Sequence, residues 1–353
     1  MLDQTATSVP EFRVKINGTD RPEITALAIA VSVHQDLSAP GMFTLRLFDS
    51  GATTLEDTLA DEDMFAPGNA VEFEMGYMGQ TETLFVGEIT GLEPQYCADE
   101  AQALVVRGYD RLHRLMRGRK TRSFAQVKDS DIAGQIAGDA GLSPSTEDTG
   151  VVLEYVLQNN QTDLEFLHAR AAPIGYEVVV DDRTLHFRAR QNTGAASFTI
   201  APDQDLIEFY PRLSTMGQVG KSTVRGWNAK DKEAIVGEAT VGDEATKMQG
   251  DSIGPEAADE AFGSSEAART QSPVFSQAEA DKIAVGRFNE MALAYVSGEG
   301  VCIGRTDLRA GIVIDIEGLG QRFSGPYYVT STTHSITSST GYRTAFSVRR
   351  NAT

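Results

Sequence analysis

The spacing Glu165-x-x-His168 is the clearest candidate for metal chemistry in this sequence. On a helix the two side chains would share one face, where a carboxylate and an imidazole can bind a metal ion as in carboxylate-bridged bundles. The second copy of the motif that such bundles carry is missing, and Glu165 follows Thr162 at the spacing of a helix capping box. The pattern therefore favours a structural role for Glu165, and we expect neither a bound metal nor a cofactor.

The other histidines and the two cysteines occur singly. Cys97 and Cys302 stand far apart, and no partner accompanies either of them at zinc-ligand spacing. The two thiols are predicted to be small buried side chains in a reducing compartment. Four histidines also lack such partners, so we expect none of them to be catalytic. They are His34, His113, His186 and His334.

Nucleophile and nucleotide-binding motifs are also missing from the sequence. It contains neither a Gly-x-Ser-x-Gly elbow nor a Walker loop. The glycines of Gly318-Leu-Gly320 precede strand patterns, whereas a dinucleotide site needs a helix N-terminus for the pyrophosphate, so they are predicted to be turn glycines. The run Asp61-Glu62-Asp63 is predicted to be solvated, while glycosidase chemistry needs a buried carboxyl with a raised pKa. We expect no enzyme. The alternative of another class is a β-barrel carbohydrate-active or peptidoglycan-cleaving enzyme.

A basic cluster interrupts the acidic background between residues 111 and 122. It is a candidate contact for an acidic neighbouring subunit or for nucleic acid. The competing interpretation is a solvated linker whose arginines bind nearby carboxylates. Nucleic acid is the least favoured partner, because no aromatic residues for base stacking are interleaved. The members of the cluster are Arg111, Arg114, Arg117, Arg119, Lys120 and Arg122.

Composition limits the class of protein. The 353 residues are too many for one ordinary domain, and 50 acidic against 31 basic residues give a net charge of −19. Such a charge repels phosphate backbones and anionic membranes, so we expect neither stable nucleic-acid binding nor membrane insertion. The first residues lack the basic and apolar regions of a signal peptide, which predicts synthesis in the cytoplasm.

The elements that would position these residues alternate between strand-rich and helical zones. Residues 1–110 read as a first barrel of short strands separated by turn residues. Residues 111–196 read as an inserted α+β domain with helices over 129–140 and 162–172 and a hairpin over 176–188. The expected first-zone strands are 12–16, 28–33, 43–48, 71–75, 84–92 and 103–107.

The last third of the chain returns to strands after an interruption. Residues 197–239 are predicted to begin a second barrel and residues 296–353 to complete it. Between them, residues 240–295 are expected to form a mobile acidic loop, up to about residue 275, and then a helix that Ser276 and Glu279 would cap. The predicted fold class is therefore α+β and β-rich, with two tube-like barrels and an inserted α+β domain.

An internal echo links the two strand zones. Val71-Glu-Phe-Glu matches Ile314-Asp-Ile-Glu, and at the same offset Phe85-Val86 matches Tyr328-Val329. One residue of slippage later, Leu104-Val-Val-Arg107 matches Phe346-Ser-Val-Arg349. Alternation in any β-rich sequence could produce such matches by chance, and a duplication of one barrel is the alternative that we expect.

The chain resembles a known family in several places that follow one another in the right order. They are Gly108-Tyr-Asp-Arg-Leu-His-Arg-Leu115, 155–167, Ala171-Ala-Pro-Ile-Gly-Tyr176 and the strand, turn and strand pattern of 304–350. This pattern resembles the late control protein D family, the baseplate hubs of contractile phage tails. That family is similar to the hub portion of VgrG-type spike proteins of type VI secretion.

The resemblance implies a structural protein that adapts a six-fold inner tube to a three-fold spike. Its hubs carry two similar barrels per chain, so a homotrimeric ring would present six. The expected partners are an inner tube protein, other baseplate proteins and a separate spike protein, since no needle module follows Arg350. The expected location is the baseplate of a phage tail or injection particle. A tail-tip hub of a non-contractile phage remains a second alternative.

The alternation of two strands suggests what would line the lumen of such a ring. Four carboxylates alternate with the apolar residues Val71, Phe73, Ile314 and Ile316, and would therefore point to the opposite face of each strand. A like-charged wall would keep anionic cargo from adhering. The candidate lumen-lining residues are Glu72, Glu74, Asp315 and Glu317.

Overall fold

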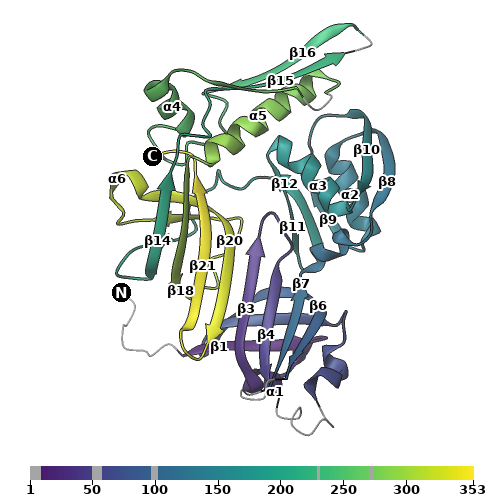
Figure 1. Cartoon of the computed structure of the whole chain (residues 1–353), viewed down its shortest axis with the longest axis vertical. Helices are drawn as coiled ribbons and strands as arrows, with labels where there is room; N and C mark the ends of the chain where they lie inside the picture. Colours follow the sequence, from purple (N-terminus) through teal and green to yellow (C-terminus); the bar gives the residue numbers. More distant parts are fainter. Residues whose placement is uncertain (1–8, 50–57, 97–101, 229–230, 271–273) are drawn as a thin grey trace. The chain divides into compact units, whose positions relative to one another are not determined.

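The computed structural model describes residues 9–49, 58–96, 102–228, 231–270 and 274–353 (Figure 1). The chain divides into two compact units. The first comprises the described residues of Met1–His113 with Val301–Ala310 and Ser331–Phe346, and the second comprises those of Arg114–Gly300 with Gly311–Thr330 and Ser347–Thr353. The chain is rich in antiparallel strands and has fewer helices, as the sequence predicts.

The first unit is built on one sheet with the strand order β2-β1-β5-β6-β7-β4-β3. All six strands expected from the sequence in this zone are present. Alternation sets the two faces of the sheet: in β5, Val71, Phe73 and Met75 are buried while the residues between them are not. The elements are β1 (Pro10–Ile16), β2 (Thr19–Asp20), α1 (Pro22–Leu27), β3 (Ala28–Asp36), β4 (Met42–Phe48), η2 (Leu59–Asp61), η3 (Asp63–Phe65), β5 (Ala70–Tyr77), β6 (Gln80–Gln95), β7 (Ala103–Tyr109) and η4 (Arg111–Met116).

The first unit also includes the end of a strand from the last part of the chain. Residues Ser331–Thr337 of β20 (Gly325–Thr337) pair antiparallel with Ala30–Asp36 of β3. At this seam His34 Nδ1 lies 2.9 Å from Thr333 Oγ1. The described pairings therefore lead from β3 to β20, whereas closure of the first sheet by itself would need β3 to pair back to β1.

The segment predicted as an inserted domain forms two small sheets and two helices in the second unit. Thr162 caps α3 as expected, because its hydroxyl accepts from the Glu165 amide at 3.1 Å and Glu165 accepts from the Thr162 amide at 3.0 Å. The predicted helix over 129–140 is present as α2, which begins at Asp129 with Lys128 as its N-cap, whereas the sequence favours Asp129 or Ser130 for that position. The elements are β8 (Lys120–Val127), α2 (Asp129–Asp139), β9 (Ser143–Thr146), β10 (Leu153–Gln161), α3 (Asp163–Ala171), η5 (Ala172–Ile174), β11 (Tyr176–Asp181) and β12 (Thr184–Ala189).

The region expected to be a loop, up to residue 275, contains regular structure. A short helix, α4, occupies Gly254–Phe262, and β17 pairs parallel with β15 beside the β15–β16 hairpin. The segment is rich in Gly, Ala, Ser, Asp and Glu, and this composition predicts a loop. The long helix α5 packs against β15 and β16, as Figure 1 shows. The bounds are β15 (Lys221–Asn228), β16 (Glu233–Thr240), β17 (Glu266–Arg269) and α5 (Gln277–Leu293).

Close contacts fix α5 at two glycines. A Cβ atom on Gly286 would lie 2.4 Å from the Pro173 carbonyl oxygen, and one on Gly237 of β16 would lie 2.2 Å from the Ala280 carbonyl carbon. Only a residue without a side chain allows the backbones to approach so closely. At its N-terminus the Ser276 hydroxyl accepts from the Glu279 amide at 3.2 Å, but the Glu279 carboxylate accepts from Phe275 instead of Ser276, so the expected capping box is half formed.

The remaining strands repeat the order of the first sheet. Their path is β14-β18-β21-β20-β19-β13. Read from β19 to β14, the order β19-β20-β21-β18-β14 matches the order β5-β6-β7-β4-β3 of the first sheet. Strands β18, β20 and β21 contribute residues to both units. The bounds are β13 (Thr199–Ile200), β14 (Leu206–Leu213), β18 (Val296–Ile303), β19 (Val313–Ile316), α6 (Gly320–Phe323) and β21 (Gly341–Arg350).

The register of this repeat differs from the sequence echo. Val71 pairs with Gly87 and Ile314 pairs with Tyr327, so if Val71 corresponds to Ile314, Gly87 corresponds to Tyr327. The echo placed Gly87 opposite Thr330, three residues further on. The connections differ, because β5 leads into β6 through a short turn whereas α6 lies between β19 and β20, so one sequence offset is not kept across both strand pairs. The strand order is thus as predicted, while the residue alignment within β6 and β20 is corrected.

Candidate functional site

In the candidate metal motif, Glu165 takes part in a helix cap and in an ion pair. Glu165 completes the capping box of α3 and also accepts from Arg119 Nη2 at 2.9 Å. Among the described residues no group of three or more His, Cys, Asp or Glu side chains is placed to hold a metal ion. His34 and His334 are bonded to neighbouring groups, and burial lowers the pKa of His334 to about 3. These contacts are structural ones, and the prediction of no bound metal stays a prediction.

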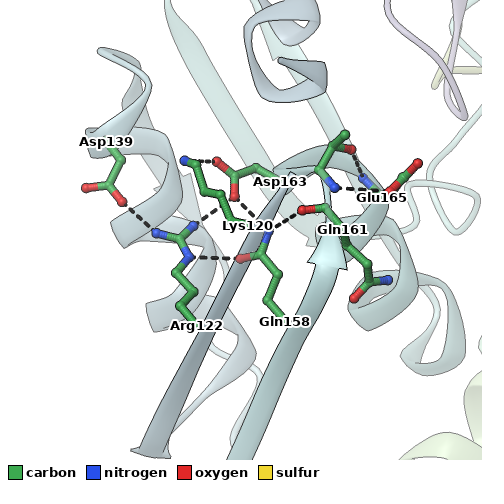
Figure 2. A network of polar contacts seen from close by, with 8 residues as sticks. Lys120, Arg122, Asp139, Gln158, Gln161, Asp163 and Glu165 are labelled. Carbon is green, nitrogen blue, oxygen red and sulfur yellow. Dashed lines mark hydrogen bonds and ion pairs between the residues drawn. The ribbon is translucent and has the colours of Figure 1, made fainter. Parts of the chain in front are cut away.

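Two members of the basic cluster, Lys120 and Arg122, bind carboxylates of the same chain, as Figure 2 shows. Arg122 donates to Gln158 at 2.8 Å, to Asp139 at 2.9 Å and to Asp163 at 2.8 Å. Lys120 donates to the other oxygen of Asp163 at 2.6 Å. The Asp163 side chain is 7% exposed, so this carboxylate is neutralised inside the fold by two cations.

The other members of the cluster lie apart from this network. Arg111 is buried in the first unit, where its Nε lies 3.2 Å from Glu88 Oε1, and His113 approaches the same carboxylate at 3.8 Å. Arg119 donates to the Asn160 carbonyl at 2.6 Å as well as to Glu165. Arg117 is exposed and Arg114 is half-buried. The interpretation of arginines bonded to nearby carboxylates therefore fits Arg111, Arg119, Lys120 and Arg122, and a role in a partner contact stays a prediction.

The candidate lumen residues lie on the expected strand faces. Glu72 and Glu74 project from the face of β5 opposite the buried Val71 and Phe73, and Lys15 of β1 binds both carboxylates, at 3.1 Å for Glu72. Burial works against ionisation of Glu72, but hydrogen bonds from Thr83 and Lys15 outweigh it and lower the pKa of Glu72.

The second pair of lumen candidates is arranged differently. Asp315 is half-buried in β19 between the buried residues Ile314 and Ile316, and Glu317 is exposed just after the strand ends. The alternation predicted from the sequence is thus present in both strands. Whether the four carboxylates line a lumen depends on assembly and stays a prediction.

A largely apolar groove of about 750 Å³ lies within the second unit. Its walls come from β10, α3, η5, β15 and the start of α5. Nothing in the sequence indicated it, because its walls are distant in the chain. The apolar lining includes Tyr155, Phe166, Ile174, Phe275 and Ile283.

Two buried carboxylates, Glu279 at this groove and Asp129, lie near the same arginine. Arg170 lies between them: it donates to Asp129 at 2.6 Å and approaches Glu279 at 4.0 Å. Burial raises the pKa of Glu279, against the effect of the Phe275 amide and Arg170. Arg170 therefore pairs closely with Asp129 and only approaches Glu279, and the three side chains form one ion cluster within the fold.

A second buried network joins the β11–β12 hairpin to β20, and sequence reasoning missed it. The Tyr328 hydroxyl donates to Glu177, and both residues are buried. Glu290 of α5 binds Arg190 and also accepts from Arg349 at 2.9 Å. The residues come from elements far apart in sequence, so spacing within one segment does not indicate the network.

Comparison with solved structures places this architecture among phage tail proteins. The chain superposes on a 43 kDa tail protein of prophage MuSo2 from Shewanella oneidensis with a TM-score of 0.69 and 16% identity, covering 97% of this chain and 98% of that one. A tail protein from Neisseria meningitidis MC58 gives the same TM-score at 10% identity, with 97% of each chain covered. The chain therefore has the fold of these tail proteins.

A third similar structure is an E. coli component of the type VI secretion system, described as structurally similar to the T4 bacteriophage tail proteins gp27 and gp5. Its TM-score is 0.60 at 12% identity, over 97% of this chain and 77% of that one. The family model of the Alg8 N-terminal domain matches residues 6–338, so the chain belongs to that family. No curated protein sequence matches the chain. Within the described residues, no helix has the length and apolar character to cross a membrane.

Proposed function

We propose that the chain is a structural baseplate hub of a contractile phage tail or a phage-tail-like injection system. In this role it adapts a six-fold inner tube to a three-fold spike. The late control protein D type of hub, which the sequence resembles, is the form that we propose. The single observation that carries the proposal is the repeated strand order in the two halves of the 13-stranded sheet. The likeness to tail proteins over 97% of the chain supports it.

The repeat explains how one chain could serve two symmetries. Two similar halves of the sheet per chain give six similar positions when three copies close a ring, and cyclic closure leaves no unused association surface between subunits. The tube would contact the six positions, and a separate spike protein would contact the three-fold side. Exposed Arg117 is a candidate contact for other baseplate proteins, because the rest of the chain is acidic.

We assign no catalytic role to the chain. The residues that could do chemistry have structural partners in the fold, as with Glu165 in its helix cap and Glu279 beside Arg170. Elemental analysis of the purified chain should detect no stoichiometric metal. A peptidoglycan-release assay should give the rate of buffer alone. Release that disappears in a Glu279→Gln variant would establish an enzyme and refute this assignment.

Co-expression with the neighbouring spike gene tests the hub. Native mass spectrometry of the purified complex should give three copies of this chain and three of the spike protein. A complex with six hub copies, or no complex with the spike, contradicts the proposal. Alanine at Arg117 should leave the ring of three intact and weaken only the binding of other baseplate proteins. Alanine at the exposed residue Arg225 is the matched control.

A further inference from the structure

Each chain contains two repeats of one strand order, formed by β3 to β7 and by β14 and β18 to β21, and one strand pairing joins them. The strands that would form the equivalent second pairing are present but do not pair with each other in the described chain. In the first unit, Ala30–Asp36 of β3 pair with Ser331–Thr337 of β20. Strand β3 belongs to the first repeat and β20 to the second, where β20 takes the position of β6. By the same correspondence, β14 of the second repeat has the position that β3 has in the first. Likewise, β6 of the first repeat has the position that β20 has in the second.

Strand β14 has an edge that the described chain leaves largely unpaired. On one side it pairs with β18. On the other side the described residues provide only a bridge from its first residue, Leu206, to Pro202. Tyr210 is 67% exposed and Arg212 is exposed near the end of the strand. A proline inside a strand is confined to sheet edges, and Pro211 marks β14 as such an edge.

The matching part of β6 is exposed where its counterpart in β20 is covered. With Val71 matched to Ile314, Gly87 corresponds to Tyr327 and Ser331–Thr337 correspond to 91–97, of which 91–95 lie in β6. In β20, Thr332 and His334 of this stretch are 1% and 0% exposed. In β6, residues 93–95 are exposed, although β7 pairs along their other edge.

We infer that the last part of β14 binds the last part of β6 of a second copy of this chain, repeating between copies the β3–β20 pairing seen within one. The occupant is a second copy because the complementary edge is on the same polypeptide, and head-to-tail repetition of one contact generates a ring when the rotation closes. The closure at three copies rests on the proposed function, whereas the pairing itself rests on the repeat.

Two prolines limit the strength of this contact. Pro211 in β14 and Pro94 in β6 have no amide hydrogen, so the ladder has fewer hydrogen bonds than the β3–β20 seam, whose paired residues include no proline. Such edges resist uncontrolled pairing of single chains. Assembly should therefore depend on concentration, and a Pro211→Val variant should assemble at a lower concentration than the wild type.

Cysteine pairing between two differently labelled copies tests the contact directly. Cys97 is replaced by Ser in both, and the buried Cys302 is kept. One copy carries Arg212→Cys and the other Glu93→Cys, both at exposed positions. After mild oxidation, the mixture should give a disulfide-linked heterodimer in at least tenfold excess over a control mixture in which Tyr155→Cys replaces Arg212→Cys. Equal yields in the two mixtures overturn the inference.

Hydrogen exchange of the unmodified full chain provides a second measurement. On assembly, the non-proline amides of 207–213 and 91–95 that point to the free edges should exchange at least tenfold more slowly than in the dilute monomer. A trimer without this protection overturns the strand pairing and leaves the proposed hub standing. A chain that stays monomeric at its solubility limit and in the presence of the spike protein overturns both.

Discussion

Single buried groups in this fold have ionisation properties that sequence spacing does not reveal. The carboxylate of Asp110 accepts from the Gly41 amide at 2.7 Å and from the Leu112 amide at 2.9 Å. These bonds favour the charged form, but burial outweighs them and raises the pKa of Asp110 to about 7. The proton on this carboxyl therefore becomes part of the stability of the first unit.

The pH dependence of unfolding should carry the signature of Asp110. Its pKa is near 3.9 in an unfolded chain, so its contribution to stability is complete below that pH and is lost as the pH rises through about 7. The loss amounts to at most roughly 4 kcal/mol. Urea unfolding between pH 4 and 8 should show a smaller decline for Asp110→Asn than for the wild type. Glu23→Gln, at an exposed site, should keep the wild-type slope.

The Tyr328 hydroxyl should be worth more than a surface hydrogen bond. Burial first, and then the Glu177 carboxylate, raise the pKa of Tyr328, so it remains a donor at neutral pH. Tyr328→Phe removes the donor and leaves a buried carboxyl short of a partner, which should lower the free energy of unfolding by about 1–3 kcal/mol. A double-mutant cycle with Glu177→Gln measures the pair. Additive effects of the two substitutions would show that the residues are not coupled.

The sequence revealed the residue contacts that are local. Thr162 and Glu165 stand three residues apart, and their capping box was predicted and is present. Tyr328 and Glu177 stand 151 residues apart, and no pattern in either segment points to the other. The same holds for Asp163, whose two cations come from a strand about 40 residues earlier. Long-range pairs depend on the fold, which spacing alone does not specify.

At the scale of elements, strands with strict alternation could be predicted and short segments of small residues could not. β5 alternates buried and half-buried residues over most of its length, so its faces were readable. Helix α4, over Gly254–Phe262, is rich in alanine and acidic residues, and this composition predicts a loop. The strand order followed from the echo, but the register did not, because alternation within a strand does not show how the connection to the next strand is built.

The placement of α5 should depend on a missing side chain. Gly286→Ala would bring a Cβ atom to 2.4 Å from the Pro173 carbonyl oxygen, so the helix must shift away from η5. We expect a loss of about 1–3 kcal/mol in the free energy of unfolding. Gly138→Ala in α2 is the matched control, since nothing lies within 4 Å of its Cβ position. That change should stabilise by up to about 1 kcal/mol through helix propensity. Equal effects of the two substitutions would contradict the contact.

At the scale of the whole molecule, the net charge of −19 becomes an argument about assembly. Like-charged copies repel one another, so association must come from specific edges and must strengthen as salt screens the repulsion. Because the strand order is repeated, each chain has two such edges, one on β14 and one on β6. An acidic hub with a repeated sheet is therefore consistent with a ring that forms only when partners or concentration favour it.

The candidate lumen residues lead to a prediction about the assembled ring. Neutralising all four, as Glu72→Gln, Glu74→Gln, Asp315→Asn and Glu317→Gln, should leave three copies per ring, because partly exposed ion pairs such as Lys15 with Glu72 contribute about 1 kcal/mol or less. The ring should then bind short single-stranded DNA measurably in fluorescence anisotropy at low salt, since the repelling wall is gone. A control with the same loss of charge replaces exposed Glu23, Glu154, Glu233 and Glu260 by Gln. If this control binds DNA as strongly as the lumen variant, the four carboxylates do not line the passage, and only the net charge matters.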